Sequence, residues 1–149
     1  MKNLVYFFVA VVMIVFNLSC NSDDTSSIEP NLSGDIVGMW KLDYAYCVER
    51  DEPISTTYCE LQETVSFSES GEFIHQQYYP NSSGDCLPQS TSYYTYYINQ
   101  NTLYAASAGT SDTWIEEWEM LELTETTLIL SRYFTLNEET YIFTYNRIN

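Results

Sequence analysis

Hydrophobic and polar residues alternate in short runs beyond residue 35, and no run shows the i, i+3, i+4 apolar period of an amphipathic helix. The runs are rich in Tyr, Thr, Val, Ile and Phe, and turn residues such as Ser70-Gly71 separate them, which is typical of hairpin-linked strands. The eight segments predicted as strands are Trp40–Val48, Thr64–Ser68, Glu72–Tyr79, Tyr93–Ile98, Thr102–Ala106, Trp114–Leu123, Leu128–Phe134 and Thr140–Ile148. Because the connections are short, we expect an all-β, antiparallel up-and-down barrel, whose closure removes exposed sheet edges.

The alternation changes phase within one long segment. In Trp114–Leu123 the change falls near Met120, and a β-bulge there would explain it because a bulge inserts one extra residue. In the first segment we expect one face to carry Trp40, Leu42, Tyr44 and Tyr46. The stretch from Pro80 to Asp85 has the composition of a loop. An open or flattened sheet is the structural alternative to a closed barrel.

The same alternation predicts which side chains face the interior of the barrel. The candidate ligand-binding residues on this face are Tyr44, Phe73, His75, Gln77, Tyr94, Tyr96, Tyr141 and Phe143. Aromatic side chains line many pockets for small molecules. They can equally fill an eight-stranded barrel, whose interior is just wide enough for side chains or one small ligand. His75, the single histidine of the chain, either hydrogen-bonds a ligand or is a satisfied core or rim residue.

The N-terminal segment differs from the rest of the chain. An unbroken apolar run from Leu4 to Phe16 follows Lys2, as in the hydrophobic region of a signal peptide, and it is shorter than the roughly 20 residues of a membrane span. Ser19-Cys20 at its end resembles the lipobox of bacterial lipoproteins, although Asn17 stands where that family prefers Leu. The resemblance implies cleavage after Ser19, lipidation of Cys20 with acyl chains such as palmitate, and stable membrane anchoring.

Three regions follow from this organisation. We expect a lipoprotein signal peptide at 1–19, a lipidated cysteine with a flexible polar tether at 20–33, and a single barrel domain at 34–149. Asp23 and Asp24 resemble the export signal of surface-exposed lipoproteins in some Gram-negative bacteria. We therefore expect attachment to the outer membrane at the cell surface, with the periplasmic face as the alternative.

Charge and motifs narrow the possible chemistry. The net charge of −16 repels phosphate backbones, so we expect no nucleic-acid partner. The densest acidic run, Glu116 to Glu122, is split by strand alternation between two faces, so its carboxylates do not converge as an acid and base pair. Gly-x-Ser-x-Gly, phosphate-loop and calcium-loop motifs are absent from the sequence. We therefore expect no catalytic residues, no cofactor, no metal and no enzymatic activity.

Three cysteines follow Cys20, and the exported compartment permits disulfides. We favour a Cys59–Cys86 bond because each residue lies near the open end of the strand pair that the bond would join, but a pair that includes Cys47 remains open. A zinc site that uses the cysteines and His75 lacks the CxxC or HxxxH spacing of such sites.

Gly38-Met39-Trp40 resembles the Gly-x-Trp element that begins the first strand of the lipocalin superfamily. An ordered series of further matches extends the resemblance to the short bacterial lipocalin-like domains of lipoproteins: Ile36–Leu42, Cys59, Phe67, Gly71–Phe73, Cys86, Asn101–Leu103, Leu123–Leu128 and Tyr145–Arg147. In lipocalins a late arginine packs across the first-strand tryptophan. The resemblance therefore implies a structural trio of Gly38, Trp40 and Arg147 at the closed end of the barrel, with a guanidinium over an indole.

Two functions are compatible with these features. The first is a membrane-anchored lipocalin-like lipoprotein that binds a small hydrophobic or aromatic ligand. The alternative is a filled barrel that binds no ligand and serves as an interaction or structural protein of the cell envelope, with a protein partner that the sequence does not identify. Because the fold hosts many roles, the choice between the two depends on whether the barrel contains a cavity.

Overall fold

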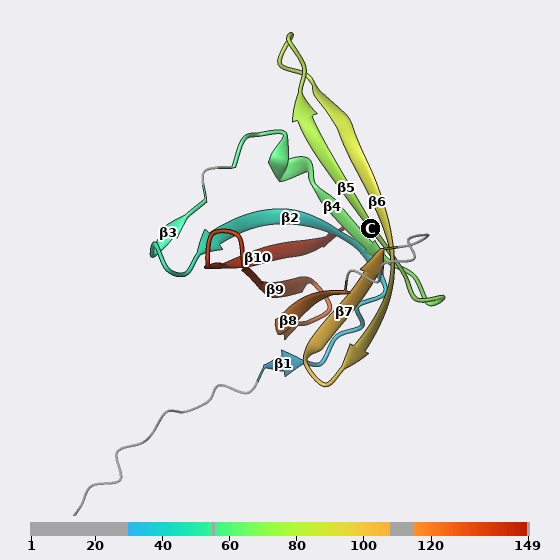
Figure 1. Cartoon of the computed structure of the whole chain (residues 1–149). Helices are drawn as coiled ribbons and strands as arrows, with labels where there is room; N and C mark the ends of the chain where they lie inside the picture. Colours follow the sequence, from blue (N-terminus) through green and yellow to red (C-terminus); the bar gives the residue numbers. More distant parts are fainter. Residues whose placement is uncertain (1–29, 55, 108–114, 149) are drawn as a thin grey trace, which may run out of the picture.

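A computed structural model of the chain describes residues 30–54, 56–107 and 115–148 (Figure 1). Its elements are β1 (Asn31–Leu32), β2 (Gly38–Cys47), β3 (Glu52–Pro53), the short 3₁₀ helix η1 (Glu60–Gln62), β4 (Thr64–Phe67), β5 (Glu72–Pro80), β6 (Cys86–Asn99), β7 (Thr102–Ser107), β8 (Ile115–Leu123), β9 (Thr127–Phe134) and β10 (Glu139–Ile148). No helix in the described ranges is long and apolar enough to cross a membrane.

Eight of the strands form a closed antiparallel barrel, which confirms the predicted fold class. The ring runs in the order β2, β4, β5, β6, β7, β8, β9 and β10, and β10 returns to β2. Apart from β3 and the closing pair of β10 with β2, each neighbour in the ring is the next strand in the chain. The short β3 pairs only with the end of β2, at Tyr46 and Cys47. Figure 1 shows the β5–β6 hairpin projecting beyond the other strands.

Three β-bulges interrupt the register of the described strands: one lies between β5 and β6 at Gln77 and Tyr78, and the other two lie in β8 and β2. In β8, Met120 pairs with Leu130 and Glu122 pairs with Ile129, so Leu121 is the extra residue, close to the phase change predicted at Met120. The bulge in β2 lies where the register with β10 skips Asp43. The alternation of residues in β2 gives no sign of this bulge, which reverses the faces of the strand from residue 44 onward.

The hydrophobic core fills the closed end of the barrel. Trp40 is fully buried, and its Nε1 donates a hydrogen bond to the Ile36 carbonyl at 2.8 Å. The Arg147 Cζ lies 4.2 Å from the centroid of the Trp40 ring, and Arg147 also donates to the carbonyls of Asp35, Val37 and Glu125. The first and last strands of the barrel are therefore joined through one guanidinium.

Gly38 makes this arrangement sterically possible. Its φ is +141°, a conformation that L side chains rarely adopt, and a Cβ at this position would lie 2.5 Å from Arg147 Nη1. A larger residue at position 38 would strain the backbone and displace the guanidinium from the ring of Trp40.

The ordered contacts of the barrel begin before the boundary predicted at Gly34. Asn31 and Leu32 form β1, which pairs in parallel with β8 at Glu122 and Leu123. The predicted signal peptide, Cys20 and most of the predicted tether lie outside the described residues. The end of that tether thus already belongs to the barrel wall.

Candidate functional site

The open end of the barrel lies opposite Trp40 and Arg147, where the chain connects β2 to β4, β5 to β6, and β9 to β10. A disulfide bond joins Cys59, just before η1, to Cys86 at the start of β6, with a Cα–Cα distance of 5.2 Å. This is the pair that the strand positions favoured, and Cys47 remains buried as a free thiol. The bond holds the β2–β4 connection against the projecting β5–β6 hairpin.

A cavity of about 370 Å³ opens between the β2–β4 connection and the β5–β6 hairpin. We call it the mouth cavity. It is lined by Leu42, Ala45, Ile54, Thr56, Thr57, Glu60, Glu63, Gln77, Tyr78, Tyr79, Pro80, Gln89 and Phe143. Leu42 and Ala45 are core residues, and Phe143 packs against the core, so the inner part of the cavity is apolar. Polar side chains such as Gln77 and Glu60 lie nearer to solvent.

One wall of the mouth cavity contains a group of polar side chains centred on Glu63. The Glu63 Oε1 lies 2.9 Å from His75 Nε2, but the imidazole is not aligned for a hydrogen bond, so this contact is a close approach of charges when the histidine is protonated. The buried Tyr145 hydroxyl donates to the same oxygen at 3.4 Å. Burial, together with the Glu63 carboxylate, raises the pKa of Tyr145 well above its ordinary value.

A family model described as "Lipocalin-like domain" matches residues 36–130, well over half of the chain. The chain belongs to the lipocalin-like domain family. The match spans β2 to the first half of β9, and in the structure β10 completes the lipocalin-like barrel beyond it.

The lipocalin-like fold also occurs in a solved structure that this chain resembles. This is an uncharacterized protein from Bacteroides eggerthii DSM 20697, with a TM-score of 0.54 and 15% sequence identity, and the similarity covers 76% of this chain and 100% of that one. At this identity the similarity establishes the fold alone. No curated protein matches the chain.

The lipocalin-like barrel does not bring the predicted ligand-binding residues together at one site. Gln77 and Phe143 line the mouth cavity, and His75 lies in the wall behind it beside Glu63. Phe73 is buried in the core between Phe67 and Tyr94, at ring-centroid distances of 4.8 and 5.2 Å.

The other predicted residues lie away from the mouth cavity. Tyr94 and Tyr96 pack against the core, and the Tyr96 hydroxyl donates to the Ser68 carbonyl at 3.0 Å. Tyr141 packs edge-on against Phe134 near the start of β10. These three side chains therefore serve the packing of the barrel.

Tyr44 is a correction to the prediction from alternation. Its side chain is 43% exposed on the outer face, whereas Ala45 and Cys47 are buried. The cause is the bulge at Asp43, which shifts every following residue of β2 by one position and so exchanges the two faces. Tyr46, expected on the inner face for the same reason, is half-buried and donates its hydroxyl to Asp51.

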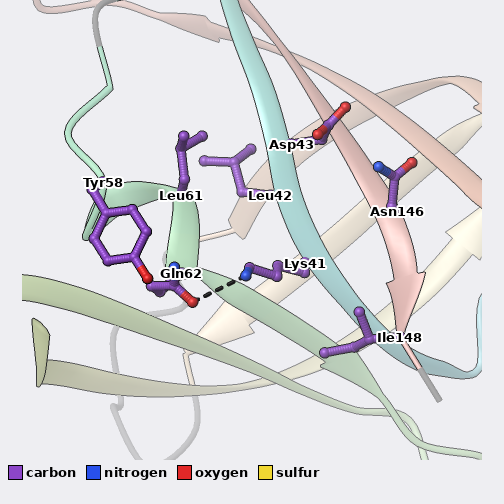
Figure 2. A pocket seen from close by; sticks show the side chains of 8 residues that line it. All are labelled: Lys41, Leu42, Asp43, Tyr58, Leu61, Gln62, Asn146 and Ile148. Carbon is purple, nitrogen blue, oxygen red and sulfur yellow. Dashed lines mark hydrogen bonds between the residues drawn. The ribbon is translucent and has the colours of Figure 1, made fainter.

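A second hollow lies on the outer surface, between η1 and the strands β2 and β10 (Figure 2). It has a volume of about 310 Å³, and the Lys41 Nζ donates a hydrogen bond across it to Gln62 Oε1 at 3.0 Å. Figure 2 shows this bond crossing the hollow below Leu61 and Leu42. Because a bonded polar pair spans it and Tyr58 at its rim is 74% exposed, it is a weaker candidate for an apolar ligand than the mouth cavity.

The described residues contain no group of three or more His, Cys, Asp or Glu side chains placed to hold a metal ion. Ala45 and Glu63 are mouth-cavity residues that the sequence analysis missed. The bulge that turns Ala45 inward depends on the register between β2 and β10, and Glu63 lies in a connection rather than in an alternating strand, so neither carries a local signal.

Proposed function

We propose that this protein is a membrane-anchored lipocalin-like lipoprotein that binds a small hydrophobic or aromatic ligand at the open end of its barrel. The mouth cavity is the observation that carries the proposal. Its volume of about 370 Å³ falls in the lower part of the range for small-molecule pockets, and its floor is formed by Leu42, Ala45 and Phe143. A barrel filled with side chains up to its rim would offer no such space.

The lining also indicates how a ligand would be oriented. An apolar or ring-bearing part fits against Phe143 and Ala45, and a polar part fits toward Gln77 and Glu63. A few polar groups around an apolar floor are the usual arrangement in pockets that bind one kind of molecule. The arrangement favours a binding role rather than a catalytic one.

The anchoring part of the proposal rests on the N-terminal sequence. The apolar run before Cys20 and the lipobox-like residues around it support lipidation, and Asp23 and Asp24 support display at the surface of the outer membrane. The Cys59–Cys86 disulfide is compatible with an oxidising compartment outside the cytoplasm.

Native mass spectrometry of the protein, purified from the envelope of its own host, tests the ligand-binding part. We expect a small-molecule mass that co-purifies with the wild type and is lost in Gln77→Trp, whose larger side chain fills the mouth cavity. Gln76→Trp is the matched control, because the Gln76 side chain bonds along the outer face to Ser90 and Thr91. A bare protein mass for the wild type, together with no binding of an apolar fluorescent probe, would instead support the alternative role as an interaction or structural protein.

Metabolic labelling with an alkyne analogue of palmitate tests the anchoring part. We expect label on the wild type and on Cys47→Ser, and none on Cys20→Ser. Protease treatment of intact cells then separates surface display from the periplasmic face. Label that persists in Cys20→Ser would contradict the proposed lipidation site.

A further inference from the structure

The barrel wall has a seam at which two neighbouring strands stop pairing. The pairs between β8 and β9 run from Leu123 with Leu128 to Glu119 with Ser131. Both strands continue toward the open end, β8 back to Ile115 and β9 on to Phe134, without a further pair between them in the described residues. A cleft of about 840 Å³ lies where the pairing ends, and we call it the seam cleft.

Arg132, in the lining of the seam cleft, lies close to two aromatic rings. The Arg132 Cζ lies 4.9 Å from the ring centroid of Trp118 and 4.7 Å from that of Phe134. Its Nη1 donates to Glu116 Oε2 at 2.6 Å, and both side chains are about one-fifth exposed (23% and 21%). The bond to Glu116 spans the gap between β8 and β9, so the side chains hold the walls of the cleft where backbone pairing does not.

Trp118 lines this cleft and has a buried hydrogen-bond donor. The residue is 6% exposed, and its Nε1 is buried without a hydrogen-bond partner in the structure. The other such atom among the described side chains is His75 Nε2, which lies 2.9 Å from Glu63 Oε1. An unpaired buried N–H costs free energy that one acceptor would recover, and native proteins leave few of them. By contrast, the indole of Trp40 at the closed end is bonded to a carbonyl.

Charges around the cleft restrict the kind of acceptor. Glu116 already balances Arg132, while Glu117 and Glu119 add exposed carboxylates to the lining. A carboxylate or phosphate ligand would be repelled by this lining. An uncharged acceptor would avoid that penalty. It would reach the buried indole N–H after a small shift of the Trp118 side chain, and its apolar part would contact the rings of Trp118 and Phe134.

We propose that the seam cleft is a second binding site, separate from the mouth cavity, for an uncharged aromatic molecule whose carbonyl or hydroxyl oxygen accepts a hydrogen bond from Trp118 Nε1. The two sites lie on either side of the contact between Trp118 and Phe143, whose ring centroids are 5.7 Å apart. The inference thus extends the proposed function from one site in the barrel to two.

Fluorescence titration with three matched probes tests the chemistry. The probes are propionyl-dimethylaminonaphthalene, which is an uncharged ketone, the same ring system without the propionyl group, and the anionic anilinonaphthalene sulfonate. We expect the ketone to bind about tenfold more tightly than the ring without a carbonyl, which is the gain from one good hydrogen bond. We expect the sulfonate to bind most weakly. The preference for the ketone should disappear in Trp118→Phe and persist in Gln77→Trp, which blocks only the mouth cavity.

Nuclear magnetic resonance of the wild type gives a readout that does not depend on whether Trp118→Phe folds. The chain has three tryptophans, so its spectrum contains three indole N–H signals. The signal of Trp118 should move downfield when the ketone probe is added, as expected for a new hydrogen bond.

The outcomes separate the second site from the proposed function. Ketone binding that is abolished by Gln77→Trp and leaves the Trp118 signal unmoved would overturn the seam site and still support the mouth cavity. Equal affinity for the ketone and the ring without a carbonyl would also overturn it. Failure of all three probes to bind would count against both sites.

Discussion

At the closed end of the barrel, Trp40 and Arg147 satisfy their polar atoms within the fold, whereas at the open end Trp118 and His75 each keep a buried nitrogen without a hydrogen bond. Both ends pair an arginine with a tryptophan, at 4.2 Å for Arg147 and 4.9 Å for Arg132. Arg147 bonds to backbone carbonyls, and Arg132 bonds to a carboxylate across a gap.

The comparison shows that a contact between an arginine and a tryptophan serves two purposes in this barrel. Arg147 bonds to backbone carbonyls, which are fixed parts of the fold. This arginine therefore joins the last strand of the barrel to the start of the first one. At the open end, the walls are instead held by the ion pair of Arg132 with Glu116 and by the Cys59–Cys86 disulfide. Polar groups at this end are left facing the mouth cavity and the seam cleft. Stability is therefore expected to concentrate at one end and ligand chemistry at the other.

Truncation of the closed end should have the largest effect. Trp40→Ala removes a fully buried indole, and we expect it to lower the free energy of unfolding by about 3–5 kcal/mol, as measured by urea denaturation. The neighbouring Met39 is 49% exposed, so Met39→Ala should change stability by less than about 0.5 kcal/mol. A loss below about 1 kcal/mol in Trp40→Ala would show that the closed end does not anchor the barrel.

Loss of the disulfide at the mouth should have the next largest effect. Its cysteines are separated by 27 residues, and the double variant Cys59→Ser/Cys86→Ser should lose about 2–4 kcal/mol, because the unfolded chain regains the freedom that the cross-link removes. Each single variant should lose nearly as much, since one cysteine cannot form the bond. Urea denaturation under non-reducing conditions measures all three, and unchanged midpoints would contradict the expectation.

Alkaline pH should lower the free energy of unfolding through Tyr145, whose hydroxyl donates to Glu63 at the wall of the mouth cavity. The pKa of Tyr145 is raised by burial and by Glu63, so the folded protein keeps the hydroxyl proton at a pH where the unfolded chain has lost it. The contribution of this protonated hydroxyl to the free energy of unfolding is therefore fully present below about pH 10. Above that value the free energy of unfolding falls as the pH rises, by up to about 1.4 kcal/mol per pH unit for this one group.

Tyr145→Phe isolates the contribution of that hydroxyl. Urea denaturation at several pH values between about 8 and 11 should give a shallower alkaline decline for the variant than for the wild type. Parallel declines in the two proteins would mean that other tyrosines, such as Tyr46 with a pKa raised to about 12, account for the loss.

The barrel could be predicted from the sequence because its evidence is periodic. Alternating apolar residues and short turns indicate strands in a meander, and the phase change near Met120 marked a bulge that the structure places at Leu121. The sequence around Asp43 shows no such phase change, although a bulge lies there. Tyr44 and Tyr46 continue the alternation as well as the smaller Ala45 and Cys47 do, and the packing that chooses between them depends on β10.

The sites were less predictable because they depend on where pairing stops. The first half of β6 contains Pro88 and several Ser and Thr residues, so its composition resembles a loop. Arg132 and Glu116 are 16 residues apart, and they meet only because β8 and β9 separate beyond Ser131. Such separations follow from long-range register, which no local pattern encodes.

The parallel pairing of β1 with β8 determines how the barrel would be held. Glu122 and Leu123, the partners of β1, are the last residues of β8 and lie at the closed end. The chain is therefore fixed to the barrel wall from Asn31 onward, so residues 21–30 are all that separates the wall from Cys20. With the proposed lipid on Cys20, these ten residues span at most about 35–40 Å when fully extended, so the barrel works within that distance of its membrane, like a float on a short line.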